Sequence, residues 1–157
     1  MNHHPSRRRC EVGILALATT LSVILLTACS SKPPGCADEQ TVNMAKSILL
    51  ERWKGISASY VRNFNMSSEA ANQYNQALKL DIREIVSNGY DESARRHVCK
   101  GVFALSTPTG MSFTSSRAFS SQATEEGGGK FIVEVENVDS IATLGADFSG
   151  YVTSQKK

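Results

Sequence analysis

The chain has 157 residues, of which 41% are hydrophobic and 20% are charged, so its composition is that of an ordinary globular protein. Composition excludes collagen-like, mucin-like and fully disordered chains, and the length suits a single domain. The formal net charge of +2 at pH 7 originates in the N-terminal segment, so the remainder gives no electrostatic case for binding nucleic acid.

The first residues form a positively charged segment followed by an apolar one. Arg7–Arg9 precede Val12–Leu26, a run of 15 apolar and small residues. The run suits the apolar region of a secretory signal peptide and is short for crossing a bilayer, which takes about 20 residues. Residues 1–28 are therefore predicted to be a removable leader. Taking its three arginines and Glu11 from 17 basic and 15 acidic residues leaves 14 of each and no net charge.

The apolar run closes with Leu26-Thr27-Ala28-Cys29. This aliphatic residue, two small residues and cysteine resemble the lipobox of the bacterial lipoprotein class. The resemblance implies cleavage after Ala28, a diacylglyceryl group on the Cys29 sulfur and an N-acyl chain such as palmitate on the new amino group. Because Ser30 is not the aspartate that retains such proteins in the inner membrane, it also implies the periplasmic face of the outer membrane. The alternative is an uncleaved transmembrane anchor in which Cys29 has no role.

Residues 29–37 are predicted to form the lipidated N-terminus and a short tether, whose proline and glycine content disfavours helix. The leader takes one of the four cysteines and the lipid takes Cys29, so Cys36 and Cys99 remain. An even remainder in an exported chain predicts one disulfide bond. The alternatives are a reactive thiol and a metal site, for which the mature chain adds only His97 as a further ligand.

Between about residue 38 and about residue 54, apolar residues recur three and four positions apart, which predicts an amphipathic helix. Asp38 suits its N-cap, and Gly55 is expected to mark its end. A serine then caps a second, shorter helix over Glu69–Ala77. The apolar stripe of the first helix consists of Val42, Ala45, Leu49, Trp53 and Ile56.

After residue 78, apolar and polar residues alternate, which is the period of half-buried strands. Two antiparallel strands are predicted over residues 78–86, with a bulge near the end, and over residues 96–105. The turn between them is expected at Ser87–Asp91, which contains the favoured Asn-Gly pair. A weaker, polar strand over residues 111–120 is expected at a sheet edge, and the clearest one-sided strand begins at Phe131.

These elements predict an α+β fold for residues 38–137, in which the amphipathic helix packs on an antiparallel sheet of about four strands. Cys36 lies just before the helix and Cys99 lies in the second strand, so their bridge would join helix to sheet. Residues 138–157 have few apolar runs and are expected to form a loosely ordered tail.

The mature chain contains no recognisable catalytic set. His97 is its one histidine, and no Gly-x-Ser-x-Gly pattern accompanies it. We therefore expect no catalytic residue, no metal and no cofactor beyond the lipid on Cys29. The polar edge strand predicts contacts with a periplasmic protein partner, because unpaired strand edges are docking sites. The residues named for this role are Ser112, Thr114 and Ser116.

The sequence thus predicts a membrane-anchored, non-catalytic protein-binding module. By analogy with other small lipoproteins, it would be an accessory component of an envelope or secretion machine, or an immunity-type inhibitor of a toxin that attacks the cell wall. The alternative is an envelope enzyme, or an enzyme subunit, that uses His97. Nothing in the sequence indicates the oligomeric state.

Overall fold

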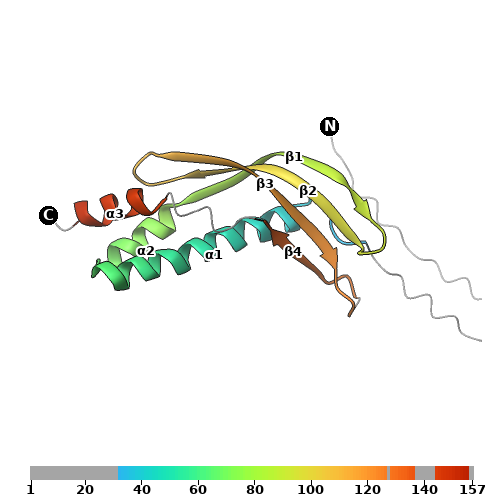
Figure 1. The fold of residues 1–157 in the computed structure, drawn as a ribbon, viewed down its shortest axis with the longest axis horizontal. Helices are drawn as coiled ribbons and strands as arrows, with labels where there is room; N and C mark the ends of the chain where they lie inside the picture. Colours follow the sequence, from blue (N-terminus) through green and yellow to red (C-terminus); the bar gives the residue numbers. More distant parts are fainter. Residues whose placement is uncertain (1–31, 127, 137–143, 156–157) are drawn as a thin grey trace, which may run out of the picture.

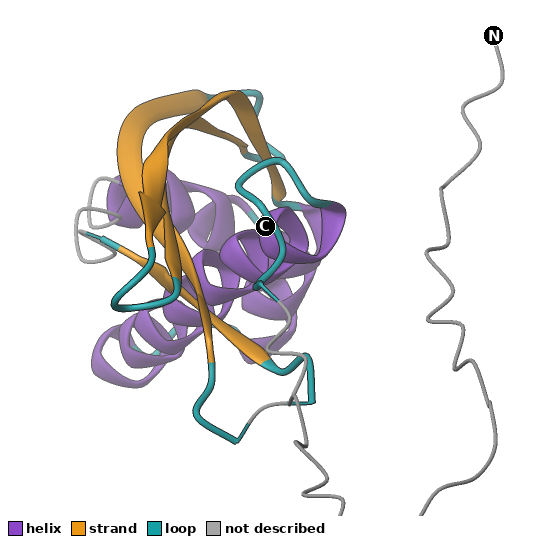
Figure 2. Ribbon diagram, turned by 90° about the vertical axis from the view of Figure 1, so that its right-hand side faces the viewer, coloured by secondary structure: helices purple, strands orange, loops and turns teal. Residues whose placement is uncertain are grey.

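The computed structural model describes residues 32–126, 128–136 and 144–155. The described residues form three helices and a four-stranded antiparallel sheet, which confirms the predicted α+β fold. The strands lie in the order β1-β2-β3-β4, and Figures 1 and 2 show the helices gathered on one side of the curved sheet. The elements are α1 (Glu39–Phe64), α2 (Ser68–Ala77), β1 (Lys79–Asp91), β2 (Arg96–Ser106), β3 (Ser112–Ala123), β4 (Phe131–Val135) and α3 (Leu144–Ser154).

Helix α1 begins where the sequence predicts but continues well past its predicted end at Gly55. The Asp38 carboxylate accepts a hydrogen bond from the Gln40 N–H at 2.9 Å and caps the first turn. Gly55 lies on the exposed side of the helix, and packing of the turns that follow it outweighs the cost of about 1 kcal/mol for a helical glycine. The helix ends at Asn65, whose φ of 48° is left-handed.

The buried face of α1 contains the predicted apolar stripe. Ala45, Leu49 and Trp53, four residues apart, are each at most 5% exposed. The indole N–H of Trp53 donates a hydrogen bond of 2.9 Å to the side-chain oxygen of Asn75 on α2. Helix α2 starts after the Ser67 cap and matches the predicted second helix within one residue. The hydrogen bond between Trp53 and Asn75 ties α1 to α2 and gives the buried indole N–H a partner.

Strands β1 and β2 form the predicted antiparallel pair, but the turn between them comes later than predicted. β1 runs through Asn88-Gly89, where the register shifts, and ends at Asp91. The Asp91 carboxylate accepts hydrogen bonds from the Ser93 hydroxyl at 2.6 Å and the Ala94 N–H at 3.0 Å. These bonds place the turn after Asp91, because a turn needs such local partners. The bulge predicted near residue 85 is present as a further register shift.

Strand β3 was predicted at a sheet edge, and this prediction is wrong for its second half. β3 pairs with β2 over its length, and with β4 from Phe119 to Ala123. Among the described residues, Ser112–Arg117 have β2 on one side and no strand on the other. The strand is therefore interior at one end and an edge at the other.

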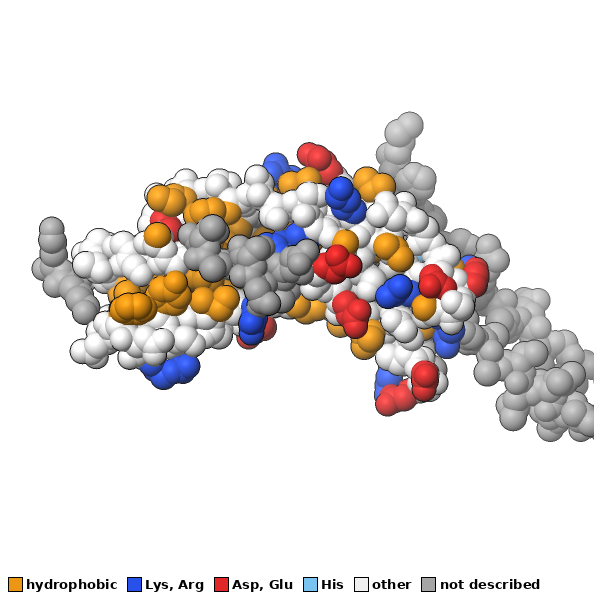
Figure 3. Space-filling model, in the orientation of Figure 1, with side chains coloured by type: hydrophobic (Ala, Val, Ile, Leu, Met, Phe, Trp, Pro, Cys, Tyr) orange, Lys and Arg blue, Asp and Glu red, His pale blue; other side chains and the backbone are white. Residues whose placement is uncertain are grey.

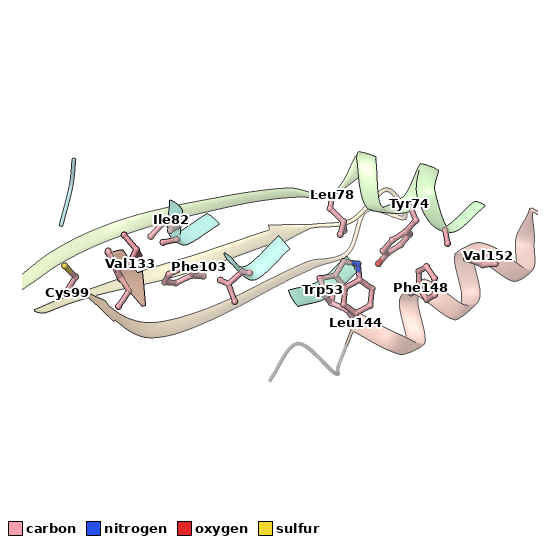
Figure 4. Close-up of a cluster of buried hydrophobic side chains, with 14 of the residues drawn as sticks. Trp53, Tyr74, Leu78, Ile82, Cys99, Phe103, Val133, Leu144, Phe148 and Val152 are labelled. Carbon is pink, nitrogen blue, oxygen red and sulfur yellow. The ribbon is translucent and has the colours of Figure 1, made fainter. Parts of the chain in front are cut away.

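The prediction of a loosely ordered tail is wrong for residues 144–154, which form helix α3. Leu144, Phe148 and Val152 are each at most 1% exposed. Their spacing of four residues puts them on one face of the helix, and this face packs against α1 and α2 (Figure 4). Packing thus overrides the low helix propensity of the two glycines in the segment. Residues 138–143 and 156–157 of the predicted tail lie outside the described residues.

Phe148 lies at the centre of an aromatic cluster, which is defined here as Trp53, Tyr60, Tyr74 and Phe148. Its ring centroid is 5.8 Å from that of Trp53, 6.1 Å from that of Tyr60 and 5.2 Å from that of Tyr74. The three interplanar angles lie between 75° and 83°. Such edge-to-face pairs add about 0.5–1.5 kcal/mol each beyond burial. The cluster therefore fastens α3 to the two other helices.

A buried carboxylate joins α3 to α2 and to the turn between β2 and β3. Asp147 is 7% exposed and accepts a hydrogen bond of 2.6 Å from the Tyr74 hydroxyl. Its other oxygen accepts one from the Thr109 hydroxyl. Burial and the hydrogen bond to Asp147 raise the pKa of the Tyr74 hydroxyl well above its ordinary value. Both oxygens of the Asp147 carboxylate have hydrogen-bond partners, so we interpret Asp147 as a structural link between α3, α2 and the turn.

The predicted disulfide between Cys36 and Cys99 is present, with an S–S distance of 2.03 Å and a Cα–Cα distance of 5.6 Å. It joins the segment before α1 to β2, as expected. Figure 4 shows Cys99 near Val133, Ile82 and Phe103 under the sheet, with the aromatic cluster farther along the core. The core therefore runs continuously from the disulfide to α3.

Candidate functional site

The first half of β3 offers backbone groups for pairing. Ala123 N–H donates to the Arg95 carbonyl on the β2 side, whereas the Ala118 carbonyl accepts from Glu136 N–H on the β4 side. Backbone groups alternate between the two sides of a strand, so those of even-numbered residues face the β4 side. The backbone groups of Ser112, Thr114 and Ser116 therefore point away from β2. We call the backbone of these three residues the open edge.

A largely apolar groove lies beside the open edge. It has a volume of about 440 Å³ and lies between α1, the inner face of the sheet and the start of α3. Ligand sites of proteins commonly have volumes of about 300–1,000 Å³ and apolar walls. The described residues that line it are Leu49, Leu50, Trp53, Leu80, Phe103, Leu105, Ser112, Phe113, Thr114, Ser115, Arg117 and Leu144.

Of the described residues that line the groove, Arg117 alone is charged. It is 8% exposed, and this burial lowers the pKa of its guanidinium. A guanidinium with little water around it interacts more strongly with a carboxylate than an exposed one does, and its planar fork matches the two carboxylate oxygens. The groove is therefore apolar over most of its lining, with one buried charged side chain in it.

Of the three residues predicted to contact a partner, Ser112 and Thr114 line the groove and Ser116 does not. Ser112, Thr114 and Ser116 are exposed, and their side chains are on the sheet face opposite the helices. Sequence reasoning did not assign Arg117 a role, although it shares the inward parity of Phe113 and Phe119. That parity is the signal by which it could have been found.

The remaining predicted positions lie away from the groove. Cys29 lies outside the described residues. His97 is at the start of β2, where its ring centroid is 4.6 Å from that of Tyr90. Within the described residues, no group of three or more His, Cys, Asp or Glu side chains could hold a metal ion. His97 therefore belongs to no such metal-binding group within the described part of the chain.

On the face seen in Figure 3, charged side chains are denser at one end of the molecule and hydrophobic ones at the other, with some of each at both ends. Figure 3 shows charged side chains around the end of the sheet that carries the turn between β1 and β2, and hydrophobic ones toward α3. None of the described helices is both long enough and apolar enough to cross a membrane.

No protein-family model, curated protein or solved structure matches this chain.

Proposed function

We propose that the protein is a lipid-anchored, non-catalytic module of the outer membrane that binds an extended segment of another periplasmic protein. The observation that carries the proposal is the position of the open edge beside the apolar groove. An added strand would bond to the backbone of Ser112, Thr114 and Ser116 and place alternate side chains in the groove. The anchor is proposed from the resemblance of Leu26–Cys29 to a lipobox.

The chemistry of the groove defines the partner segment. Every second side chain of an added strand points the same way, so the inward-facing set would lie beside Phe113 of β3 and point into the groove. The partner is therefore an extended segment with alternating apolar residues.

Proline substitutions test the open edge. Thr114→Pro removes an N–H that points away from β2, whereas Ser115→Pro removes one that points toward β2. We expect Thr114→Pro to retain the wild-type melting temperature and Ser115→Pro to lower it. Binding is measured with a photo-crosslinking amino acid at Ser116, with the exposed Asn72 on α2 as the control position.

The proposal is supported if Ser116 crosslinks to an extended segment of an envelope protein, Asn72 does not, and Thr114→Pro abolishes the product. It fails if Ser116 yields no product above the Asn72 control. If Thr114→Pro melts as low as Ser115→Pro, the Thr114 N–H already has a partner within the chain, and the partner segment is excluded.

The identity of the crosslinked protein separates the two roles proposed from the sequence. A toxin that attacks the cell wall indicates an immunity-type inhibitor, and a component of an envelope or secretion machine indicates an accessory subunit. His97→Ala should leave crosslinking unchanged, because His97 does not line the groove. Loss of function in His97→Ala with crosslinking intact would favour the enzyme alternative.

A further inference from the structure

The segment that leads into the domain is held against the turn between β1 and β2. The Lys32 ammonium is 3.2 Å from a carboxylate oxygen of Glu92 and 4.5 Å from the ring centroid of Tyr90. Four residues later, Cys36 is bonded to Cys99 of β2. The ion pair is exposed and weak, but the disulfide is covalent. The chain therefore enters the domain at one defined end of the sheet.

The loop between β3 and β4 lies at the same end. Arg96 of β2 pairs with Gln122 of β3, and Ala123 N–H donates to the Arg95 carbonyl at 3.1 Å. This contact puts the loop that starts at Thr124 beside the turn between β1 and β2 (Figure 1). We call the turn Glu92–Arg95, the residues Asp91 and Arg96 that flank it, and this loop the entry end of the domain.

The opposite end of the molecule is far from the entry end. Helix α1 starts near the entry end and runs away from it for 26 residues. At a rise of 1.5 Å per residue, its far end lies about 39 Å away. That end is where α2 and α3 pack, as Figure 1 shows.

We infer that the entry end faces the lipid headgroups and that α3 faces away from the membrane. This inference rests on the proposed lipidation of Cys29. Lys32 follows Cys29 by three residues, which span at most about 11 Å when fully extended. Because Lys32 lies against Glu92, the turn Glu92–Arg95 is held close to the membrane surface.

The charges of the entry end define the kind of surface that it meets. With Lys32 included, four side chains are basic and four are acidic, so they cancel. A balanced surface has no net attraction to anionic lipid, and it faces neutral and anionic headgroups alike. The anchor, and not charge, sets the orientation. The basic residues are Lys32, Arg95, Arg96 and Lys130, and the acidic residues are Asp91, Glu92, Glu125 and Glu126.

Short-range quenching in vesicles tests the orientation. A fluorophore is attached to the full, lipidated protein at Ser93→Cys in the turn or at Thr153→Cys in α3, both exposed positions. Cys36 and Cys99 are at most 5% exposed and bonded to each other, so they do not compete for label. In the lipidated protein Cys10 is removed with the proposed leader and the Cys29 sulfur carries the proposed lipid. The protein is then placed in phosphatidylcholine vesicles with spin-labelled headgroups.

The Ser93 label should be quenched several-fold more than the Thr153 label, and the same ratio should hold when phosphatidylglycerol is added. Equal quenching, or stronger quenching at Thr153, overturns the orientation. Mass spectrometry of the N-terminus is the separate control for the anchor. Acylated Cys29 with an unquenched Ser93 label overturns the orientation alone, whereas absence of acyl mass overturns the anchor and the orientation together.

Discussion

Replacing Phe148 with alanine tests whether α3 belongs to the core. The Phe148 side chain is fully buried and packs edge-to-face against Trp53 and Tyr74. Removing a buried phenylalanine ring costs about 3–5 kcal/mol, because the neighbours only partly fill the cavity. A domain of this size has a free energy of unfolding of about 5–15 kcal/mol. At roughly 4 °C per kcal/mol, the melting temperature should fall by more than about 10 °C.

Trp53 provides the assay, because it is the only tryptophan in the chain and lies 5.8 Å from the ring of Phe148. Urea unfolding is followed by its fluorescence and, independently, by far-UV circular dichroism. Phe148→Leu is the matched control, since it keeps much of the apolar volume but loses the edge-to-face pairs, and it should cost less than Phe148→Ala. If Phe148→Ala unfolds within about 1 kcal/mol of wild type, α3 is not part of the core, and the loosely ordered tail expected from the sequence is correct.

Three further changes probe other contacts. Replacing Cys36 and Cys99 together with serine should lower the free energy of unfolding by about 2–4 kcal/mol in urea, and an unchanged midpoint would contradict a bridge that constrains the unfolded chain. Asn75→Leu should cost about 1–3 kcal/mol in the same assay, because the Trp53 N–H loses its acceptor in the core; wild-type stability would mean that water replaces the amide. Burial and the Asp147 hydrogen bond raise the pKa of Tyr74 above its ordinary value of 10.0, so the unfolded chain loses this proton first. The stability due to Tyr74 is therefore complete below about pH 10 and declines above it. Tyr74→Phe should lack this part of the decline when urea midpoints are compared across about pH 9–11, and parallel pH profiles would refute the assignment.

The parts of the fold that were predictable from the sequence are those in which local pattern and tertiary packing agree. Ala45, Leu49 and Trp53 are four residues apart and are buried on one face, as their spacing indicates. The alternation around Phe103 similarly predicted a strand that is buried on one side. The disulfide followed from the two cysteines that remain once Cys10 and Cys29 are assigned to the predicted leader and lipid anchor.

The mispredicted parts are those in which packing overrides a local signal. Gly55 was expected to end α1, but the burial of Ser57 and the partial burial of Tyr60 continue the helix past it. Leu144, Phe148 and Val152 show helical spacing, yet the glycines between them hid the pattern. The groove could not be predicted, because its walls come from helices and strands far apart in the sequence, and no local period reports how they meet.

The bond between Cys36 and Cys99 also determines how the domain would respond to mechanical tension. A pull on the chain ahead of Cys36 is transmitted through the sulfur atoms to β2, which has β1 on one side and β3 on the other. The tension therefore spreads over two ladders of backbone hydrogen bonds at once, and α1 is not peeled away turn by turn. After reduction, the same pull would reach the N-terminus of α1 first. The oxidised domain should consequently tolerate a pull on its N-terminal segment that would unravel the reduced one.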